Sequence, residues 1–422
     1  MGNEADVAVV GAGAAGLMAA IAARSAVRAK GLARRIIVLE GAQRLGAKIL
    51  VSGGGRCNVT HDVVDEKAFA GSTPNAIRRV LRRFDVPRVI GFFREQGVEL
   101  KREETGKLFP TSDDAHTVLA ALLAATRAAE VEILHPWRVE AVEYDPRSAL
   151  FVLSGPAGRM GARRLVLATG GKSLPKTGSD GGGYELAKSL GHSITPRLFP
   201  GLVPLCLPSD HWIPRLTGLS ARATLEVRNS SGKRVAAFTD ALLCTHFGLS
   251  GPAVLDVSRY FVDASLGDPG AKLVANWLSG ADFEGVDRAL LDLGQQSPSR
   301  WLRERGVPER LAQALCESAG VNGSASARTL SREGRRALSQ TIVATVLPIM
   351  GNRGFSHAEV TAGGVPLAEL RLDTLESRVC PGLYLVGEIC DVDGRIGGYN
   401  FQWAWASGYV AGSAVGAAGE AQ

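Results

Sequence analysis

The sequence lacks the cysteine pairs of a metal site or of a disulfide-stabilised protein. Six cysteines are spread along 422 residues, with no CxxC pair and no Cys/His spacing that matches a zinc site. Scattered cysteines in a chain of this length are typical of a protein kept in a reducing compartment. We therefore expect no metal ion and a cytoplasmic location.

The sequence also lacks a secretion signal and an apolar run long enough to cross a membrane. The N-terminus, Met-Gly-Asn-Glu-Ala-Asp, is acidic where a signal peptide is basic. Residues 7–23 are apolar, but a bilayer requires roughly 20 residues, and this run contains a glycine loop. We expect a buried strand, a turn and a buried helix there, and no contact with a membrane.

No long block of one charge sign occurs. Lys and Arg number 48 against 42 Asp and Glu, which gives a net charge of +6, and the sequence pI is about 9.1. The basic residues are scattered, so the chain has no obvious nucleic-acid-binding arm. A moderately basic surface suits RNA or a phosphate-rich cofactor, but it is equally typical of an ordinary solvated surface.

The first motif present is a glycine turn inside a βαβ unit. Residues 7–10 predict a buried strand, 14–29 a helix and 35–40 a second buried strand. The turn Gly11-Ala12-Gly13-Ala14-Ala15-Gly16 allows close approach of a pyrophosphate to the start of the helix. Glu40 ends the second strand, where a carboxylate takes the hydroxyls of an adenosine ribose. The unit predicts dinucleotide binding without deciding between FAD and NAD.

A second glycine-rich segment follows at residues 52–58, Ser-Gly-Gly-Gly-Arg-Cys-Asn. Three successive glycines let the backbone lie against a flat ring or a diphosphate. Arg56 can pair with phosphate, and Asn58 offers both a donor and an acceptor. Cys57 is either a proton donor or a packing residue.

Two further segments resemble the first motif, in which a buried strand leads into a glycine-rich turn. Residues 165–171 predict a buried strand that ends at Gly170-Gly171. Residues 384–401 predict a buried strand, an acidic glycine loop with Glu388 and Asp391, and a helix that begins at Phe401. Nucleotide-facing segments at opposite ends of the chain imply a long cofactor with two ends. That favours FAD over NAD and excludes a simple dehydrogenase whose halves follow one another in sequence.

The middle of the chain has a different character. Prolines become frequent beyond about residue 191, residues 223–228 and 234–238 predict antiparallel strands, and residues 281–345 are charged and helix-patterned. We therefore expect a discontinuous nucleotide-binding domain, 1–191 with 346–422. The insert would be 192–345, mainly β over 192–280 and mainly helical over 281–345.

Five blocks occur in a fixed order. They are SGGGRCNVT at 52–60, LFP at 108–110, GLSGPA at 248–253, TAGGV at 361–365, and the segment 391–403. With the four glycine-rich segments, they resemble the BaiN/RdsA-type NAD(P)/FAD-dependent oxidoreductases. This family is a branch of the glutathione-reductase-like flavoproteins, and some of its members are labelled aminoacetone oxidase. The resemblance covers essentially the whole chain.

The resemblance implies an α/β fold, in which a Rossmann-like FAD-binding domain is interrupted by a β-barrel-like insert with a small helical subdomain. Residues 361–365 would pass near the flavin. From the motifs and the resemblance together, we expect FAD contacts from Gly11, Gly13, Ala14, Ala15, Gly16, Glu40, Lys48, Gly53, Gly54, Gly55, Arg56, Cys57, Asn58, Val139, Thr169, Gly170, Gly171, Gly387, Glu388, Asp391, Gly397, Gly398, Asn400 and Phe401.

The resemblance also implies a reaction. Family members are associated with reduction of activated C=C bonds, including reduction of a uridine of large-subunit ribosomal RNA to dihydrouridine. We expect an FAD-dependent reductase with NADH or NADPH as reductant and ribosomal RNA uridine as the favoured substrate. Two alternatives stay open: an oxygen-using small-amine oxidase of the aminoacetone type, and a flavin-containing RNA-binding or assembly factor without turnover. The oligomeric state also stays open.

Three residues are candidates for the acid that protonates the substrate. They are Cys57 in the glycine loop, and His246 and His357, which lie in or near family blocks. A lone histidine is more often structural than catalytic. For RNA contacts, the candidates are Arg215, Arg222, His246 and Arg353, provided that they face a cleft.

Overall fold

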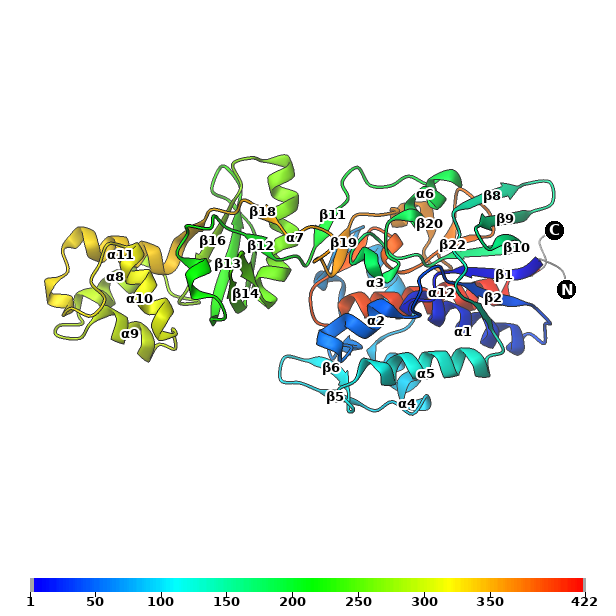
Figure 1. The fold of residues 1–422 in the computed structure, drawn as a ribbon, viewed down its shortest axis with the longest axis horizontal. Coiled ribbons are helices and arrows are strands. Elements are labelled where there is room, and N and C mark those ends of the chain that lie inside the picture. The colour runs from blue at the N-terminus through cyan, green and yellow to red at the C-terminus, as the bar shows by residue number, and fades with distance from the viewer. Residues whose placement is uncertain (1–3, 420–422) are drawn as a thin grey trace. The chain divides into compact units, whose positions relative to one another are not determined.

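The computed structural model describes residues 4–419, and the chain forms two compact units (Figure 1). The first unit runs to Phe199 and resumes at Val360, and the second comprises Pro200–Glu359. These breaks differ from the predicted domain limits at 191/192 and 345/346. At the second break the reason is that β17 (Thr345–Leu347) and β18 (Gly351–Asn352) pair with strands of the second unit.

A nine-stranded mixed sheet forms the centre of the first unit. Its strands are β1 (Glu4–Val10), β2 (Ile36–Leu39), β7 (Glu132–Leu134), β8 (Ala141–Asp145), β9 (Leu150–Gly155), β10 (Gly158–Leu167), β20 (Leu370–Arg371), β21 (Glu376–Ser377) and β22 (Leu383–Leu385). The main path is β20-β21-β22-β10-β1-β2-β7, and β9 pairs with β10 and with β8.

Five parallel strands of this sheet end at one edge, and four of them lead into the predicted site. Val10 of β1 pairs with Leu39 of β2 and with Leu167 of β10, and Leu167 pairs with Leu385 of β22. All four residues of β2 are buried, as expected for a parallel strand that is covered on both faces. The first unit is therefore a Rossmann-like α/β fold, and the loops that follow these four strands meet at the same edge.

Helices α1 (Ala14–Ala29) and α12 (Tyr399–Ala417) pack closely together in this unit (Figure 1). A Cβ atom at Gly408, Gly412 or Gly416 of α12 would lie 2.4, 2.2 or 2.2 Å from a carbonyl oxygen of α1. The two helices therefore touch backbone to backbone. The apolar run at residues 7–23 forms the end of strand β1, the glycine turn and the buried part of α1, as the sequence predicted. Within residues 4–419 no helix is long and apolar enough to cross a bilayer.

Shorter elements surround this framework. They are α2 (Ala47–Val51), β3 (Thr60–His61), β4 (Phe69–Gly71), α3 (Pro74–Leu81), α4 (Val86–Glu95), β5 (Leu100–Arg102), β6 (Lys107–Pro110), α5 (Ala115–Ala128), α6 (Gly182–Ser189), β19 (Val360–Ala362) and β23 (Val392–Gly394). Strand β11 (Phe199–Gly201) lies at the first break between the units.

The second unit contains a seven-stranded antiparallel sheet and five helices. The remaining strands are β12 (Leu205–Cys206), β13 (Ser220–Arg228), β14 (Arg234–Thr245), β15 (Gly248–Ser250) and β16 (Lys272–Asn276), and the order is β17-β16-β13-β14-β15-β12-β18. The helices are α7 (Pro252–Gly267), α8 (Phe283–Leu291), α9 (Pro298–Glu304), α10 (Glu309–Ser318) and α11 (Arg332–Ala344). The last four lie where the sequence predicted helices.

The barrel-like form expected for the insert is not confirmed. Strands β17 and β18 stand at opposite ends of the strand order, yet only a short connection joins Leu347 to Gly351. Because four residues span at most about 14 Å, the sheet must curl until its two ends approach each other. Backbone pairing between β17 and β18 is not found among the described residues, so the sheet is curled but open.

Candidate functional site

The glycine turn after β1 is tightly packed at two glycines and open at the third. A Cβ atom at Gly11 would lie 2.4 Å from the carbonyl oxygen of Ala168, and one at Gly16 would lie 1.9 Å from that of Gly11. A Cβ atom at Gly13 would meet no atom within 4 Å. Gly11 and Gly16 are therefore needed for packing, whereas Gly13 leaves free space before the first turn of α1. The N–H groups of that turn have no partner within the helix and suit an anion.

Glu40 lies directly beside this turn. One carboxylate oxygen accepts a hydrogen bond from the backbone N–H of Ala12 at 2.6 Å, and the other accepts one from Ala42 at 2.7 Å. The backbone oxygen of Glu40 accepts a bond from Trp137 at 2.6 Å, which brings the segment with Val139 alongside. Each carboxylate oxygen keeps a second lone pair for a ligand hydroxyl. The ribose contact of Glu40 and the adenine contact of Val139 stay predictions.

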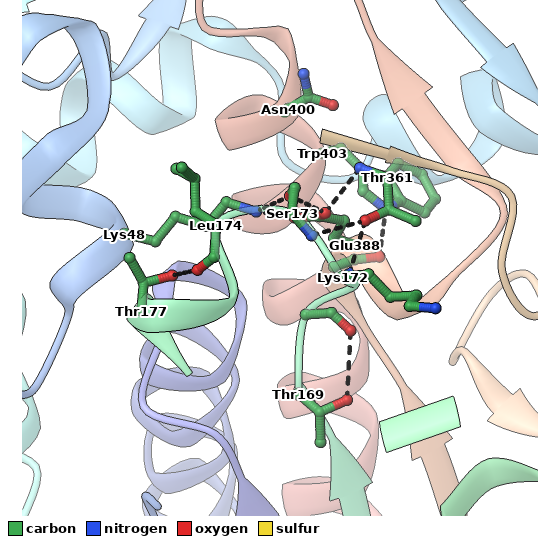
Figure 2. Close-up of polar contacts among 12 residues, drawn as sticks. Lys48, Thr169, Lys172, Ser173, Leu174, Thr177, Thr361, Glu388, Asn400 and Trp403 are labelled. Atoms are coloured by element: carbon green, nitrogen blue, oxygen red, sulfur yellow. Dashed lines mark hydrogen bonds and ion pairs between the residues drawn. The ribbon is translucent and has the colours of Figure 1, made fainter. Parts of the chain in front are cut away.

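A polar network joins four distant segments at the carboxyl edge of the sheet (Figure 2). The Lys48 ammonium lies 2.5 Å from a carboxylate oxygen of Glu388 and 2.6 Å from the hydroxyl of Ser173. The other oxygen of Glu388 accepts bonds from the Ser173 hydroxyl at 2.7 Å and from the backbone N–H of Thr361 at 2.9 Å. The half-buried Glu388 carboxylate therefore has a counter-charge and a fixed orientation.

Thr361 connects this network to the loop after β10. Its hydroxyl oxygen accepts bonds from the backbone N–H groups of Lys172 at 2.7 Å and Ser173 at 3.1 Å. A Cβ atom at Gly171 would lie 2.5 Å from the Thr361 hydroxyl and 2.7 Å from Glu388, so only glycine fits there. The sequence did not predict Ser173, and it placed Thr361 near the site without a role. The polar Lys-Ser pair directly after Gly170-Gly171 was the available signal.

The loop 52–58 turns sharply through left-handed backbone conformations. Gly53, Gly54 and Gly55 have φ angles of 56°, 69° and 85°, and Cys57 has 59°. Nothing lies within 4 Å of a Cβ atom built at Gly54, so the backbone is open to a ligand at this point. Positive φ at a non-glycine residue such as Cys57 is uncommon and is often found at functional sites.

The two polar side chains of this loop behave differently. Arg56 lies 2.7 Å from a carboxylate oxygen of Glu103, and its guanidinium stacks on Phe109 at 4.0 Å, so a phosphate would have to replace the carboxylate partner. Asn58 is 9% exposed, and among the described residues its carbonyl oxygen has no hydrogen-bond partner. A buried acceptor without a donor costs roughly 1–3 kcal/mol. Asn58 therefore fits a donor supplied by a bound group.

The segment before α12 is held by side chains from the first two turns of α12. Asn400 accepts a bond from the N–H of Gly394 at 2.8 Å and donates one to the oxygen of Gly394 at 3.0 Å. The indole N–H of Trp403 donates to the oxygen of Gly387 at 3.0 Å. Gly398 cannot carry a side chain, because its Cβ atom would lie 2.5 Å from the backbone of Thr60.

Other predicted cofactor residues lie in the same segments. Asp391 is 9% exposed in the loop after Glu388, Gly397 precedes Gly398 in the glycine turn, Phe401 stacks on Trp405 at 5.5 Å, and the hydroxyl of Thr169 lies beside its neighbour Gly170 at 3.5 Å. The structure thus brings the predicted segments together around the carboxyl ends of β1, β2, β10 and β22. That these residues contact FAD stays a prediction.

The three candidate acids lie in different surroundings. Cys57 belongs to the first unit and is fully buried, and this burial raises the pKa of its thiol to about 12. It is therefore a protonated thiol at neutral pH. His246 and His357 belong to the second unit, and both are exposed. A catalytic role for any of the three stays a prediction.

The two histidines share one cluster in the second unit. His246 meets the ring of Phe247 edge-on at 5.1 Å, and the guanidinium of Arg353 lies over the same ring at 4.4 Å. The Nε2 atom of His357 lies 2.9 Å from the Arg353 guanidinium, and its Nδ1 atom lies 3.1 Å from the Arg353 backbone oxygen. Because arginine only donates, Nε2 accepts and Nδ1 carries the proton. His357 therefore orients Arg353. Within residues 4–419 no cluster of His, Cys, Asp and Glu side chains is suited to a metal ion.

The chain resembles known proteins along nearly its whole length. The family model described as HI0933-like protein Rossmann domain matches residues 5–414. A 3-dehydro-bile acid delta(4,6)-reductase of Clostridium scindens is 35% identical over 413 residues, covering 97% of this chain and 98% of the relative. A ribosomal RNA dihydrouridine synthase of Escherichia coli is 33% identical over 410 residues, covering 96% of each protein.

A solved structure resembles the chain in fold alone. A 3-ketosteroid delta1-dehydrogenase from Sterolibacterium denitrificans, in complex with 1,4-androstadiene-3,17-dione, superimposes with a TM-score of 0.54 and covers 99% of this chain and 100% of that one. Its sequence is only 12% identical, so it bears on the arrangement of the chain and not on its substrate.

Proposed function

The chain belongs to the HI0933-like family and is an FAD-dependent oxidoreductase, and from that premise we propose that it uses NADH or NADPH to reduce an activated C=C bond. The favoured substrate is a uridine of large-subunit ribosomal RNA, which would become dihydrouridine. When bound, FAD supplies hydride chemistry at its ring system. The protein supplies position, orientation and a proton.

The free space at Gly13 and the unpartnered oxygen of Asn58 support binding of FAD between the start of α1 and the loop 52–58. The N–H groups of Ala14, Ala15 and Gly16 would hold the pyrophosphate at the start of α1. Glu40 would take the adenosine ribose. At the other end, Glu388, fixed by Lys48, would accept bonds from ribityl hydroxyls, and Asn58 would accept one from the flavin end.

The proposed reaction class rests on the chemistry that the two relatives share. Both names describe reduction of a C=C bond that is conjugated to a carbonyl group: a 3-oxo steroid with double bonds at positions 4 and 6, and the uracil ring of uridine. In each case hydride goes to one carbon of the bond and a proton goes to another position of the conjugated system. Reduction of an activated C=C bond is therefore the statement that fits both relatives.

The choice of RNA over a free small molecule is supported by charge. The net charge of +6 and the pI of about 9.1 suit a polyanion, and a small apolar substrate needs neither. A uridine within folded RNA must leave its base stack to reach a buried ring system. Cys57, His246 and His357 are the proposed sources of the proton.

One experiment with three substrates tests the proposal. The holoenzyme is incubated with NADPH or NADH and either unmodified large-subunit ribosomal RNA or a 4,6-unsaturated 3-oxo bile acid. In a third reaction, without a nicotinamide, it is incubated with aminoacetone and oxygen. We expect dihydrouridine to form in the RNA, as measured by mass spectrometry of nucleosides. Reduction of the bile acid alone would reassign the substrate, and oxygen consumption with aminoacetone alone would reassign the enzyme as an oxidase.

The proton donor is tested on the same assay. Cys57→Ser, His246→Gln and His357→Gln should each retain FAD, and loss of the true acid should lower kcat by roughly 10²- to 10⁴-fold. Unchanged turnover in all three variants would remove these residues as donors.

A further inference from the structure

The second unit contains a cavity of about 640 Å³ between its sheet and its helical part. Its wall includes Arg222 of β13, Trp277 just after β16, Ala289 of α8, Trp301 of α9 and Arg305 just after α9. No lining residue belongs to the segments predicted to hold FAD. The volume lies within the usual range for small-ligand sites and is sufficient for a nucleotide.

The apolar part of the wall contains two tryptophans beside several aliphatic side chains. Trp277 and Trp301 are 2% and 4% exposed, and the indole N–H of Trp277 donates to the hydroxyl of Thr345 at 3.0 Å. The Arg305 guanidinium lies 4.2 Å from the centre of the Trp301 ring and donates to the Trp301 backbone oxygen at 3.3 Å. Arg305 is therefore held in place by Trp301, and a held guanidinium is a flat surface on which a nucleobase can stack.

The charged part of the wall favours an anion. Two guanidiniums, those of Arg222 and Arg305, line the cavity together with a single carboxylate, that of Asp282. Asp282 already accepts the backbone N–H of Gly285 at 2.8 Å as the cap of α8. Arg222 has no ion-pair partner among the described residues. An arginine without a carboxylate partner that lines the same cavity as a second arginine is suited to phosphate.

We propose that this cavity binds one nucleotide of a single-stranded RNA segment, with its base against Arg305 and the aromatic wall and its phosphate between Arg305 and Arg222. The inference rests on the proposed RNA substrate and adds to it a recognition site outside the segments predicted to hold FAD. Base stacking combined with phosphate contacts is the usual way in which proteins hold single-stranded RNA.

The test measures binding and not turnover. A fluorescein-labelled oligouridylate is titrated with the oxidised holoenzyme, and the affinity is read from fluorescence anisotropy at several salt concentrations. Arg222→Ala and Arg305→Ala should each weaken binding roughly tenfold. Arg222→Ala should also reduce the slope of log affinity against log salt concentration by about one, as expected for the loss of one phosphate contact. Ala289→Phe fills the cavity without changing its charge and should weaken binding to a similar extent.

Arg303→Ala is the matched control. Arg303 lies on α9 and pairs with Glu309 at 3.4 Å, but it does not line the cavity, so its loss should change affinity by less than about twofold. The flavin spectrum and a thermal melt of each variant check that both units remain folded. Arg222 is exposed on β13, so its variant remains informative if Ala289→Phe fails to fold.

The outcomes separate the two proposals. Wild-type protein that binds the RNA, with all three cavity variants binding equally well, would overturn the cavity site and leave the substrate proposal standing. Wild-type protein that binds no RNA at low salt would overturn both. Cholate, a steroid carboxylate, is titrated as an alternative ligand. If Ala289→Phe abolishes binding of cholate but leaves RNA binding unchanged, the cavity binds a small carboxylate and the assignment of the cavity to RNA is wrong.

Discussion

The ammonium group of Lys48 lies 2.5 Å from a carboxylate oxygen of Glu388, although 340 positions separate the two residues in the chain. This pair connects helix α2, which follows β2, to the segment between β22 and β23. Ser173 contacts both partners and adds the loop after β10. The loops that are expected to enclose a long cofactor are thus already tied together by side chains.

Replacement of Glu388 by Gln should weaken FAD binding by roughly tenfold or more. The variant removes the counter-charge of Lys48 and one charge-assisted acceptor, and such a bond contributes roughly 1.5–3 kcal/mol. The dissociation constant of FAD is measured by flavin fluorescence. Glu369→Gln is the matched control, because Glu369 also binds a serine and a basic side chain, Ser193 and His192, outside this network. Equal FAD affinity in the wild type and both variants would contradict the assignment.

The glycines of the first turn should separate folding from binding. Gly16→Ala places a methyl carbon 1.9 Å from the backbone oxygen of Gly11, so the apoprotein should lose several kcal/mol of stability. Gly13→Ala meets no protein atom and should leave the stability of the apoprotein within about 1 kcal/mol of the wild type while lowering FAD affinity. Urea unfolding of the apoprotein and FAD titration supply the two readouts. A Gly13→Ala variant with normal affinity would place the pyrophosphate elsewhere.

The contact between α1 and α12 should tolerate no added methyl group. Alanine normally favours a helix over glycine by about 1 kcal/mol, but a Cβ atom at Gly412 would lie 2.2 Å from the oxygen of Ala19. Gly412→Ala should therefore destabilise the protein by more than about 2 kcal/mol. Gly91→Ala in α4, where a Cβ atom meets nothing within 4 Å, should be neutral or stabilising. Both are compared by urea unfolding, and destabilisation of similar size in both would rule out the close contact.

Cys57 should resist alkylation in the native protein. Burial raises the pKa of its thiol from 9.0 to about 12, so the reactive thiolate is scarce at pH 8. Because the folded pKa is the higher one, the buried thiol contributes stability that is present below pH 9 and is lost as the pH rises from 9 towards 12. Iodoacetamide labelling at pH 8, followed by peptide mass spectrometry, should modify Cys57 only after unfolding in urea. Rapid labelling of Cys57 in the folded protein would contradict its burial.

Much of the first unit could be predicted from the sequence because its signals are local. The apolar strand, the glycine turn and the helix at residues 7–29 follow one another directly, and the structure confirms them as β1 and α1. Glycines at strand ends marked the edge at which these segments meet.

Long-range contacts could not be predicted in the same way. Nothing local to Ser173 or Thr361 shows that the two residues meet across 188 positions, and nothing local to Arg56 shows that it pairs with Glu103. The two-residue strand β18 is too short for a sequence pattern, so its pairing with β12 could not be predicted either. These features depend on which segments the fold brings together.

The visible absorption spectrum of the purified protein, recorded without oxygen before and after addition of NADPH or NADH, shows whether the chain binds a flavin that a nicotinamide can reduce. We predict the spectrum of an oxidised flavin that bleaches when one of the two nicotinamides is added. If no flavin spectrum is seen, even after reconstitution with FAD, the chain does not bind FAD and the assigned cofactor is wrong.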